Sequence, residues 1–319
     1  MVLQSLLPVA FATAPYTAAQ LANTPYTAIK LTFQAEAPYK PDGDSIRMKA
    51  ANPALWPPHV KLSERDQTAQ SRMEGIDAVE LHFYGHHQPL RLAEAARDFL
   101  FAQLRIPKKN PPSEGVPGWA LTRSADLYGR DVSFLFPQEV PLVDGAQYMV
   151  GDASFSELLQ QSANYKMLQG GQAYPMFYEY LPDVMLQSMQ EASKEAQKRG
   201  RGVWSEDRTL TGGVRLTEVE NADAAVIYPK LYRRLVRYFR DFAPIMWLGR
   251  FREFMELDPD LLHLASDVTA GEVRPKLRQL HDPDILEIDT KYNHLRLLVS
   301  PEQLIFHERT KPNPRLPAH

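Results

Sequence analysis

The stretch Arg72-Met73-Glu74-Gly75-Ile76-Asp77-Ala78-Val79-Glu80 begins with an arginine and ends with an aspartate and a glutamate three positions apart. The run from Arg72 to Ile76 is typical of a β-strand, which would deliver Asp77 and Glu80 at its end. A turn directly after such a strand would aim both carboxylates at the same point. The stretch therefore predicts a strand end that presents two acids and an arginine to one site.

Two further segments extend this pattern on either side, Asp42-Gly43-Asp44-Ser45 and Asp126-Leu127-Tyr128-Gly129-Arg130. An enzyme that cleaves a phosphodiester must neutralise charge on phosphorus and activate a water. A hard divalent cation held by carboxylates does the first, and arginines grip the phosphate through paired hydrogen bonds. A further carboxylate can orient or deprotonate the water. Together the segments predict a metal-dependent phosphodiesterase.

The chemistry assigns a role to five side chains. Asp44 and Asp77 are the candidate metal ligands, and Glu80 is the candidate general base. Arg72 and Arg130 are the candidate phosphate clamp. Each motif also has a simpler explanation, because Asp-Gly-Asp is a common hairpin turn and isolated charges are common on surfaces. Their order along the chain favours the site.

This order resembles the staphylococcal (thermonuclease-type) nuclease family. The family signature runs Asp-Gly-Asp-Thr, then Arg-x-x-x-x-Asp-x-Pro-Glu, then Tyr-Gly-Arg, then a Glu/Ala-rich helix closing on Gly-x-Trp, which here is Gly202-Val203-Trp204. The resemblance covers residues 26–206. It implies an α+β fold with a five-stranded OB-like barrel and helices. It also implies a calcium-dependent nuclease that hydrolyses DNA and RNA with little sequence preference.

Carried over by motif position, the resemblance implies the roles already given and adds three residues. The backbone carbonyl of Ala78 would assist the two aspartates in holding Ca²⁺. Tyr128 and Tyr174 would contact the substrate, since tyrosines near these positions meet the nucleotide base, and such stacking suits a nuclease without sequence preference. Packing at the barrel edge is the alternative explanation for both tyrosines.

The match departs from the family pattern at several positions, among them Ser45 in place of threonine and Glu74 in place of an apolar strand residue. Val79 stands where the family usually has a proline, and losing that proline removes a fixed φ just before Glu80. A Pro-interrupted insertion at about residues 50–70 replaces a short hairpin. Homologous barrels also serve as binding modules without catalysis. The alternative function is therefore an inactive nuclease-fold module that binds nucleic acid or protein partners.

Length and composition divide the chain further. With 319 residues it is long for one small barrel, so we expect an N-terminal extension (1–25), the nuclease-like domain (26–206) and a smaller, mainly helical domain (207–319). There are no cysteines, which excludes disulfides and thiolate metal sites. The net charge of −3 argues against generic binding of long nucleic acid and requires local basic clustering instead.

The last third carries an aromatic and arginine-rich segment, residues 228–242, that predicts a helix. Further helices are expected at 244–255, 258–267 and 270–280, followed by a terminal hairpin of 295–299 with 303–308. The arginines between 233 and 240 would track a nucleic-acid backbone or form salt bridges with Glu253, Glu256 and Asp258. A protein partner or a second copy of the chain could also bind through residues 207–319.

The first residues bear on where the protein works. Leu3 to Ala14 is apolar and ends in Ala-Thr-Ala, but no Lys or Arg precedes it and Pro8 interrupts it. We therefore expect a folded extension of a cytoplasmic protein, with secretion as the alternative. No run is long enough to predict a membrane span.

Overall fold

The computed structural model describes residues 21, 24–150, 153–216, 219–242, 247–267 and 276–308. The predicted N-terminal extension lies almost entirely outside the described residues. Within the described ranges, no helix combines the length and the apolar character that crossing a membrane requires.

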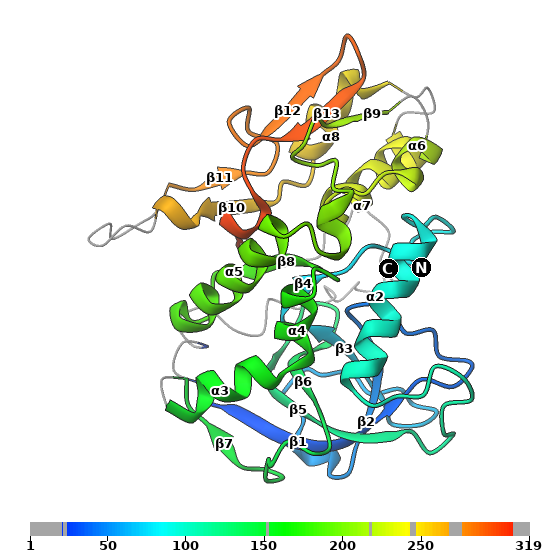
Figure 1. The fold of residues 1–319 in the computed structure, drawn as a ribbon, viewed down its shortest axis with the longest axis vertical. Helices are drawn as coiled ribbons and strands as arrows, with labels where there is room; N and C mark the ends of the chain where they lie inside the picture. The colour runs from blue at the N-terminus through cyan, green and yellow to red at the C-terminus, as the bar shows by residue number, and fades with distance from the viewer. Residues whose placement is uncertain are drawn as a thin grey trace, which may run out of the picture.

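Five strands close into a barrel at the lower end of the molecule (Figure 1). They are β1 (Tyr26–Gln34), β2 (Arg47–Ala50), β3 (Ala69–Met73), β5 (Val116–Ala125) and β6 (Asp131–Pro137). The pairs β1–β2, β2–β3, β5–β6 and β1–β5 are antiparallel, whereas β3–β6 is parallel. A short strand, β7 (Gln147–Tyr148), pairs antiparallel with Tyr26 and Thr27 at the start of β1. The prediction of an α+β fold with a closed five-stranded barrel is confirmed, and its strand order is consistent with the OB-like class.

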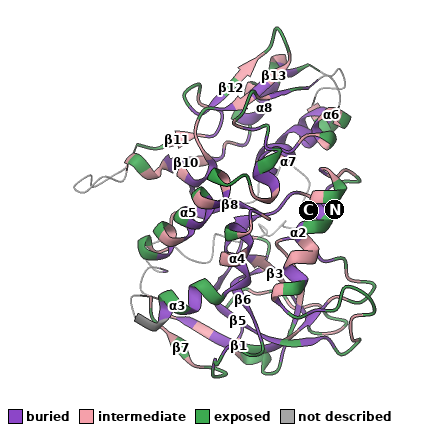
Figure 2. Ribbon diagram, viewed as in Figure 1, coloured by how far each residue is buried: buried purple, intermediate pink, exposed green. Residues whose placement is uncertain are grey.

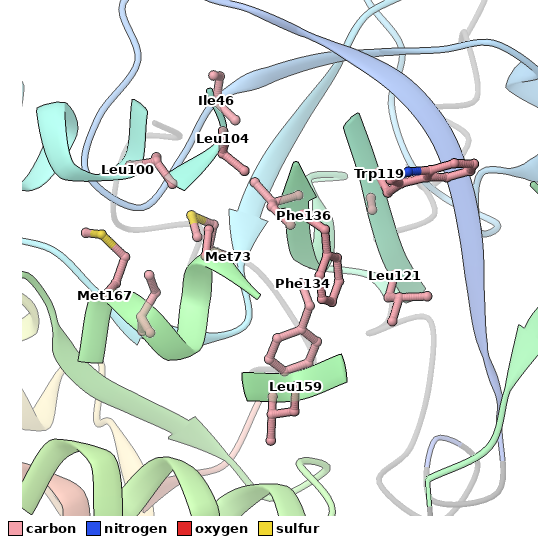
Figure 3. Packing of buried hydrophobic residues seen from close by; sticks show 14 of the residues in the cluster. Ile46, Met73, Leu100, Leu104, Trp119, Leu121, Phe134, Phe136, Leu159 and Met167 are labelled. Atoms are coloured by element: carbon pink, nitrogen blue, oxygen red, sulfur yellow. The ribbon is translucent and has the colours of Figure 1, made fainter. Parts of the chain in front are cut away.

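The barrel interior is filled from both strands and helices. Leu31 and Phe33 of β1 and Phe134 and Phe136 of β6 are almost fully buried. The helix α2 (Leu90–Gln103) covers this core with residues at helical spacing, such as Leu100 (Figure 3). Around the same core lie α3 (Ala153–Gln161), α4 (Ala163–Gln169) and α5 (Asp183–Lys198). The 50–70 insertion contains a 3₁₀ turn, Pro53–Leu55.

A second sheet joins the barrel region to the last third of the chain. Its five strands lie in the order β11 (Arg278–Gln279), β10 (Leu261–Leu264), β14 (Leu304–Phe306), β8 (Tyr174–Tyr178) and β4 (Gly75–Asp77). β14 runs parallel to β8 and antiparallel to β10. Because the sheet combines strands from both sides of residue 206, the two parts of the chain form one continuous structure there.

The prediction of a mainly helical last third is not confirmed. In its described residues the helices are α6 (Val219–Ala224), α7 (Pro229–Arg237) and α8 (Phe251–Glu256), with a π-helical turn at Tyr238–Phe242 and 3₁₀ turns at Leu248–Arg250, Ala265–Asp267 and Pro301–Gln303. A further 3₁₀ turn, Gly202–Ser205, precedes this part of the chain. Besides β10, β11 and β14, strands also form a three-stranded sheet of β12 (Leu286–Asp289), β13 (His294–Leu297) and β9 (Val214–Arg215).

Three local predictions in this part have different outcomes. The helix expected at 258–267 is wrong, because these residues contain β10 and a 3₁₀ turn. The terminal hairpin is also wrong, since β13 and β14 belong to different sheets. Most of the helix expected at 270–280 lies outside the described residues.

The two parts also share a hydrophobic core. Val79 and Trp204 pack in the same buried cluster as Tyr228, Leu231 and Leu235. Buried residues accordingly run through β8 and α7, where the barrel region meets the upper half (Figure 2). The last third is therefore fixed against the segment that carries Asp77 and Glu80.

Candidate functional site

A cleft of about 1100 Å³ lies between the barrel and α7. Its walls are the 42–45 turn, the ends of β3 and β4, the 126–130 turn and the start of α7. The predicted residues that line it are Asp44, Arg72, Asp77, Glu80, Tyr128 and Arg130. The fold thus brings together side chains from three motifs that are distant in the sequence.

The Asp42–Asp44 turn is locked against the residues after β4. Asp44 Oδ2 accepts a 2.9 Å hydrogen bond from the backbone N–H of Ala78. Gly43 lets the two segments approach, because a Cβ at this position would lie 2.7 Å from the Cβ of Ala78 and 2.9 Å from that of Ala96. The glycine of the Asp-Gly-Asp motif therefore sets the distance between the two acidic segments.

Like charges gather in this part of the cleft. Burial, and after it the neighbouring charges of Asp77 and Glu80, raise the pKa of Asp44 to about 7. Burial likewise raises the pKa of Glu80 to about 7, although the guanidinium of Arg233 acts in the opposite direction. These carboxylates therefore lie in a place that favours a cation.

Asp42 belongs to the same cluster, although the sequence reasoning did not select it. Burial and then the charge of Asp44 raise its pKa to about 7. Asp42 also lines the cleft. The sequence signal was present, because Asp42 is the first acid of the Asp-Gly-Asp motif. We define the acidic cluster as Asp42, Asp44, Asp77 and Glu80.

Arg233 of α7 supplies the positive charge that reaches this cluster. Its Nη1 and Nη2 donate to the two carboxylate oxygens of Asp77, each at 2.9 Å. The same Nη1 also donates to Glu80 Oε1. Sequence reasoning missed this contact, because nothing near residue 233 in the chain indicates that α7 packs across the barrel.

The neighbouring arginine, Arg234, forms buried ion pairs with two aspartates. Arg234 is buried and donates to Asp260 Oδ2 and to Asp258 Oδ2, each at 2.8 Å. The predicted salt bridge to Asp258 is thus present. Glu253 instead pairs with Arg250 at 2.9 Å. Arg234 and its two acids anchor α7 at the edge of the cleft.

The two arginines of the predicted clamp both reach the cleft, and each has a partner. Arg72 Nη1 lies 3.3 Å from Glu308 Oε2, and its guanidinium carbon is 4.3 Å from the centre of the Tyr178 ring. Arg130 Nε donates to Asp126 Oδ2 at 2.7 Å. The carboxylate of Asp126 thereby holds the arginine at the mouth of the cleft.

Asp126 also shapes the turn that presents Arg130. Its Oδ1 accepts the backbone N–H groups of Tyr128 at 3.0 Å and Arg130 at 2.9 Å. Gly129 between them has a φ of +86°, which a residue with a Cβ rarely adopts. The Tyr-Gly-Arg motif is therefore a turn whose glycine is required by the backbone.

The two predicted substrate tyrosines lie in different environments. Tyr128 is 39% exposed and lines the cleft. Tyr174 is fully buried, its hydroxyl donates to Asp207 Oδ1 at 2.7 Å, and its ring centre is 4.8 Å from that of Trp204. Trp204 and Tyr228 cover the ring, so the placement of Tyr174 in a substrate site is wrong and the packing alternative fits.

The donor chemistry of the acidic cluster suits a hard divalent cation, because carboxylate oxygens are the ligands that Ca²⁺ prefers. The chain segment between Asp77 and Glu80 brings the backbone of Ala78 to the same place. In the described part of the chain, however, no three His, Asp or Glu side chains are grouped as metal ligands. The cation that Asp77 and Glu80 contact in this structure is the guanidinium of Arg233.

No protein-family model matches this chain, and a search of curated proteins finds no significant match. The resemblance to thermonuclease-type nucleases therefore rests on the four sequence motifs alone.

Proposed function

We propose that this chain is a calcium-dependent nuclease, a hydrolase that cleaves phosphodiester bonds of DNA or RNA with little sequence specificity. The observation that supports it is the convergence of Asp44, Asp77, Glu80, Arg72 and Arg130 on one cleft. Carboxylates and guanidinium groups line the same cleft, and a phosphodiester and a divalent cation together require both kinds of charge.

The metal would be held by Asp44 and Asp77 with the backbone carbonyl of Ala78. When bound, Ca²⁺ would neutralise charge on the phosphate and polarise one of its oxygens. The chain itself positions these ligands, because the 42–45 turn holds Asp44 and β4 holds Asp77.

Glu80 is the general base of this proposal. Its pKa of about 7, raised by burial, suits a group that takes a proton from water near neutral pH. Arg72 and Arg130 would donate hydrogen bonds to the phosphate oxygens and stabilise the added charge of the transition state. Each arginine now contacts a carboxylate, Glu308 for Arg72 and Asp126 for Arg130. A phosphate oxygen can accept the same kind of hydrogen bond in place of these carboxylates.

The cleft also suits the polymer around the cleaved bond. Lys61 and Lys230 line it together with the two clamp arginines, and such groups can contact backbone phosphates, although nine acidic side chains line the same cleft. Tyr128 offers an exposed ring for stacking a base, and every base has a face that can stack. These contacts recognise the backbone and the ring, which fits low sequence preference.

A binding module without catalysis is the second candidate, and one observation favours it. Arg233 holds both Asp77 and Glu80, so the metal ligand and the base are ion-paired within the protein. A module of this kind would bind nucleic acid or a protein partner through the same cleft or through residues 207–308.

Plasmid digestion separates the two candidates. The full chain is incubated with supercoiled DNA and with a single-stranded RNA in CaCl₂, and again with EGTA. A nuclease nicks and degrades these substrates in calcium and stops in chelator. Binding in a gel-shift experiment without cleavage in Ca²⁺, Mg²⁺ or Mn²⁺ would reject the enzyme and favour the module.

A further inference from the structure

Arg233 contacts Asp77 in the geometry that excludes another cation. Both carboxylate oxygens accept one N–H each, at 2.9 Å, and Glu80 accepts a second hydrogen bond from Nη1. Paired hydrogen bonds of this kind are among the strongest between side chains. While they persist, the lone pairs that would face a metal ion are directed at the guanidinium.

The backbone of Arg233 is held in place. Its neighbour Arg234 is bound to Asp258 and Asp260 in the interior. Leu231 and Leu235, on the same helix, are fully buried. Movement of the whole helix would break these contacts, so any release of Asp77 must come from rotation of the Arg233 side chain alone.

The cleft provides room for that rotation. The Arg233 side chain keeps 28% of its surface exposed, and it lies in the wall of the 1100 Å³ cleft. Long arginine side chains have several accessible rotamers. The guanidinium can therefore turn into the cleft and remain solvated there, next to where an anionic substrate would lie.

The last third of the chain also places a negative charge, the carboxylate of Glu308, against a positively charged residue of the cleft. Glu308 places a carboxylate 3.3 Å from Arg72 Nη1, at the group that would receive a phosphate. Tyr180 also donates to this carboxylate at 3.2 Å. The last third of the chain thus sets a cation against the acidic cluster and an anion against the phosphate clamp.

We propose that Arg233 is a built-in competitor of the divalent cation, which occupies the acidic cluster in the resting protein and must turn away before the metal binds Asp77. This inference rests on the proposed calcium-dependent function. A resident guanidinium weakens metal binding by its charge and by occupying the ligand oxygens. It also keeps the buried carboxylates compensated while no metal is present.

Calorimetric titration of CaCl₂ into the full chain tests this competition directly. The variants are Arg233→Ala, Arg233→Lys and Arg47→Ala. Arg47 lines the same cleft but its guanidinium contacts the backbone oxygen of Thr68, so its removal deletes one positive charge without freeing Asp77. We expect Arg233→Ala to bind calcium at least about tenfold more tightly than the wild type, which corresponds to about 1.4 kcal/mol.

The controls should bracket this effect. Arg47→Ala should stay within about twofold of the wild type, and Arg233→Lys should lie between wild type and Arg233→Ala, because a lysine keeps the charge but not the paired geometry. Equal calcium affinity of the wild type and Arg233→Ala, or weaker binding by Arg233→Ala, would overturn the competition alone. Failure of every variant to bind calcium would reject the proposed function, and the competition with it.

A melting experiment covers the case in which Arg233→Ala is unstable. Without calcium, this variant should melt below the wild type, since its carboxylates lose their counter-charge. Calcium should then raise its melting temperature by more than it raises that of the wild type. The same rise in both proteins would contradict the proposal. Arg233→Gln, which keeps most of the side-chain volume, repeats the comparison if the alanine variant does not fold.

Discussion

Arg233 on α7 and Asp77 at the end of β4 are joined by two 2.9 Å hydrogen bonds, although 156 positions separate them in the sequence. The acidic cluster of the barrel is therefore completed by a helix from the last third of the chain. Activity, binding and stability should all respond to changes on either side of this contact.

Glu80→Gln should lower the rate of calcium-stimulated DNA cleavage by about 10²–10³, which is typical for loss of one acting group in a catalytic site. Glutamine has nearly the same shape but cannot take a proton from water. Initial rates on a fluorescent oligonucleotide, with calcium and with EGTA, measure the effect. Cleavage at the wild-type rate would remove Glu80 from the role of base.

Arg234→Ala should destabilise the protein by about 3–5 kcal/mol, because it removes the guanidinium from two buried carboxylates, of which Asp260 keeps its ion pair with Lys230. Arg296→Ala is the matched control, since Arg296 forms an exposed pair with Glu287 at 2.8 Å. That change should cost less than about 1 kcal/mol. Urea unfolding followed by circular dichroism gives both values, and equal costs would contradict the anchoring role of Arg234.

Tyr128→Ala should weaken the binding of a labelled single-stranded oligonucleotide by about 1–3 kcal/mol, the usual contribution of one stacked base. Tyr174→Phe should leave this binding unchanged, because Tyr174 is fully buried. It should instead lower stability by about 1 kcal/mol through loss of the hydrogen bond to Asp207. Fluorescence anisotropy in EGTA measures binding without cleavage. A loss of affinity in Tyr174→Phe would argue against the packing role.

Glu308→Gln should strengthen binding of the same oligonucleotide, since it removes the carboxylate that competes for Arg72. For a partly exposed ion pair the gain should be about 0.5–1 kcal/mol, or roughly two- to fivefold. Glu64→Gln is the control, because Glu64 is exposed in the 50–70 insertion and outside the cleft. An equal gain in affinity for both variants would show that the change in net charge, and not the release of Arg72, strengthens binding.

Asp131→Asn should stabilise the protein at pH 8 and have little effect near pH 4. Burial raises the pKa of Asp131 from 3.8 to about 7 in the folded protein. The folded state therefore binds the proton more tightly, and this group costs stability progressively as the pH rises from about 4 to about 7. The expected gain at pH 8 is on the order of a few kcal/mol. Melting temperatures of both proteins between pH 4 and pH 8 measure this gain in stability. A gain that is largest at low pH would contradict a raised pKa of Asp131.

Local sequence motifs predicted much of the barrel and most residues of the candidate site. The strand predicted from Arg72 to Ile76 is present as the two strands β3 and β4, and Gly43 of the Asp-Gly-Asp motif lets Asp44 approach Ala78. The alternation of β1 likewise follows from residues next to one another in the chain. The catalytic and metal-binding roles of these residues stay predictions.

Contacts between distant segments account for what the sequence did not predict. Arg233 and Glu308 enter the cleft only because α7 and β14 pack beside β4 and β8. The apolar residues Leu261 to Leu264 fit either a helix or a strand, and pairing with β14 decides for the strand. Trp204 and Tyr228 bury Tyr174. The motif around Tyr174 gives no sign of these contacts, because both partners are distant in the sequence.

β14 is translated long after β8, the strand beside which it lies in parallel. Until residues 304–306 leave the ribosome, the edge of β8 opposite β4 has no partner strand. Open strand edges pair with other chains, and joining such distant segments slows folding. We therefore expect the nascent protein to need chaperone protection before its final strand docks, and fragments that end at residue 206 to aggregate.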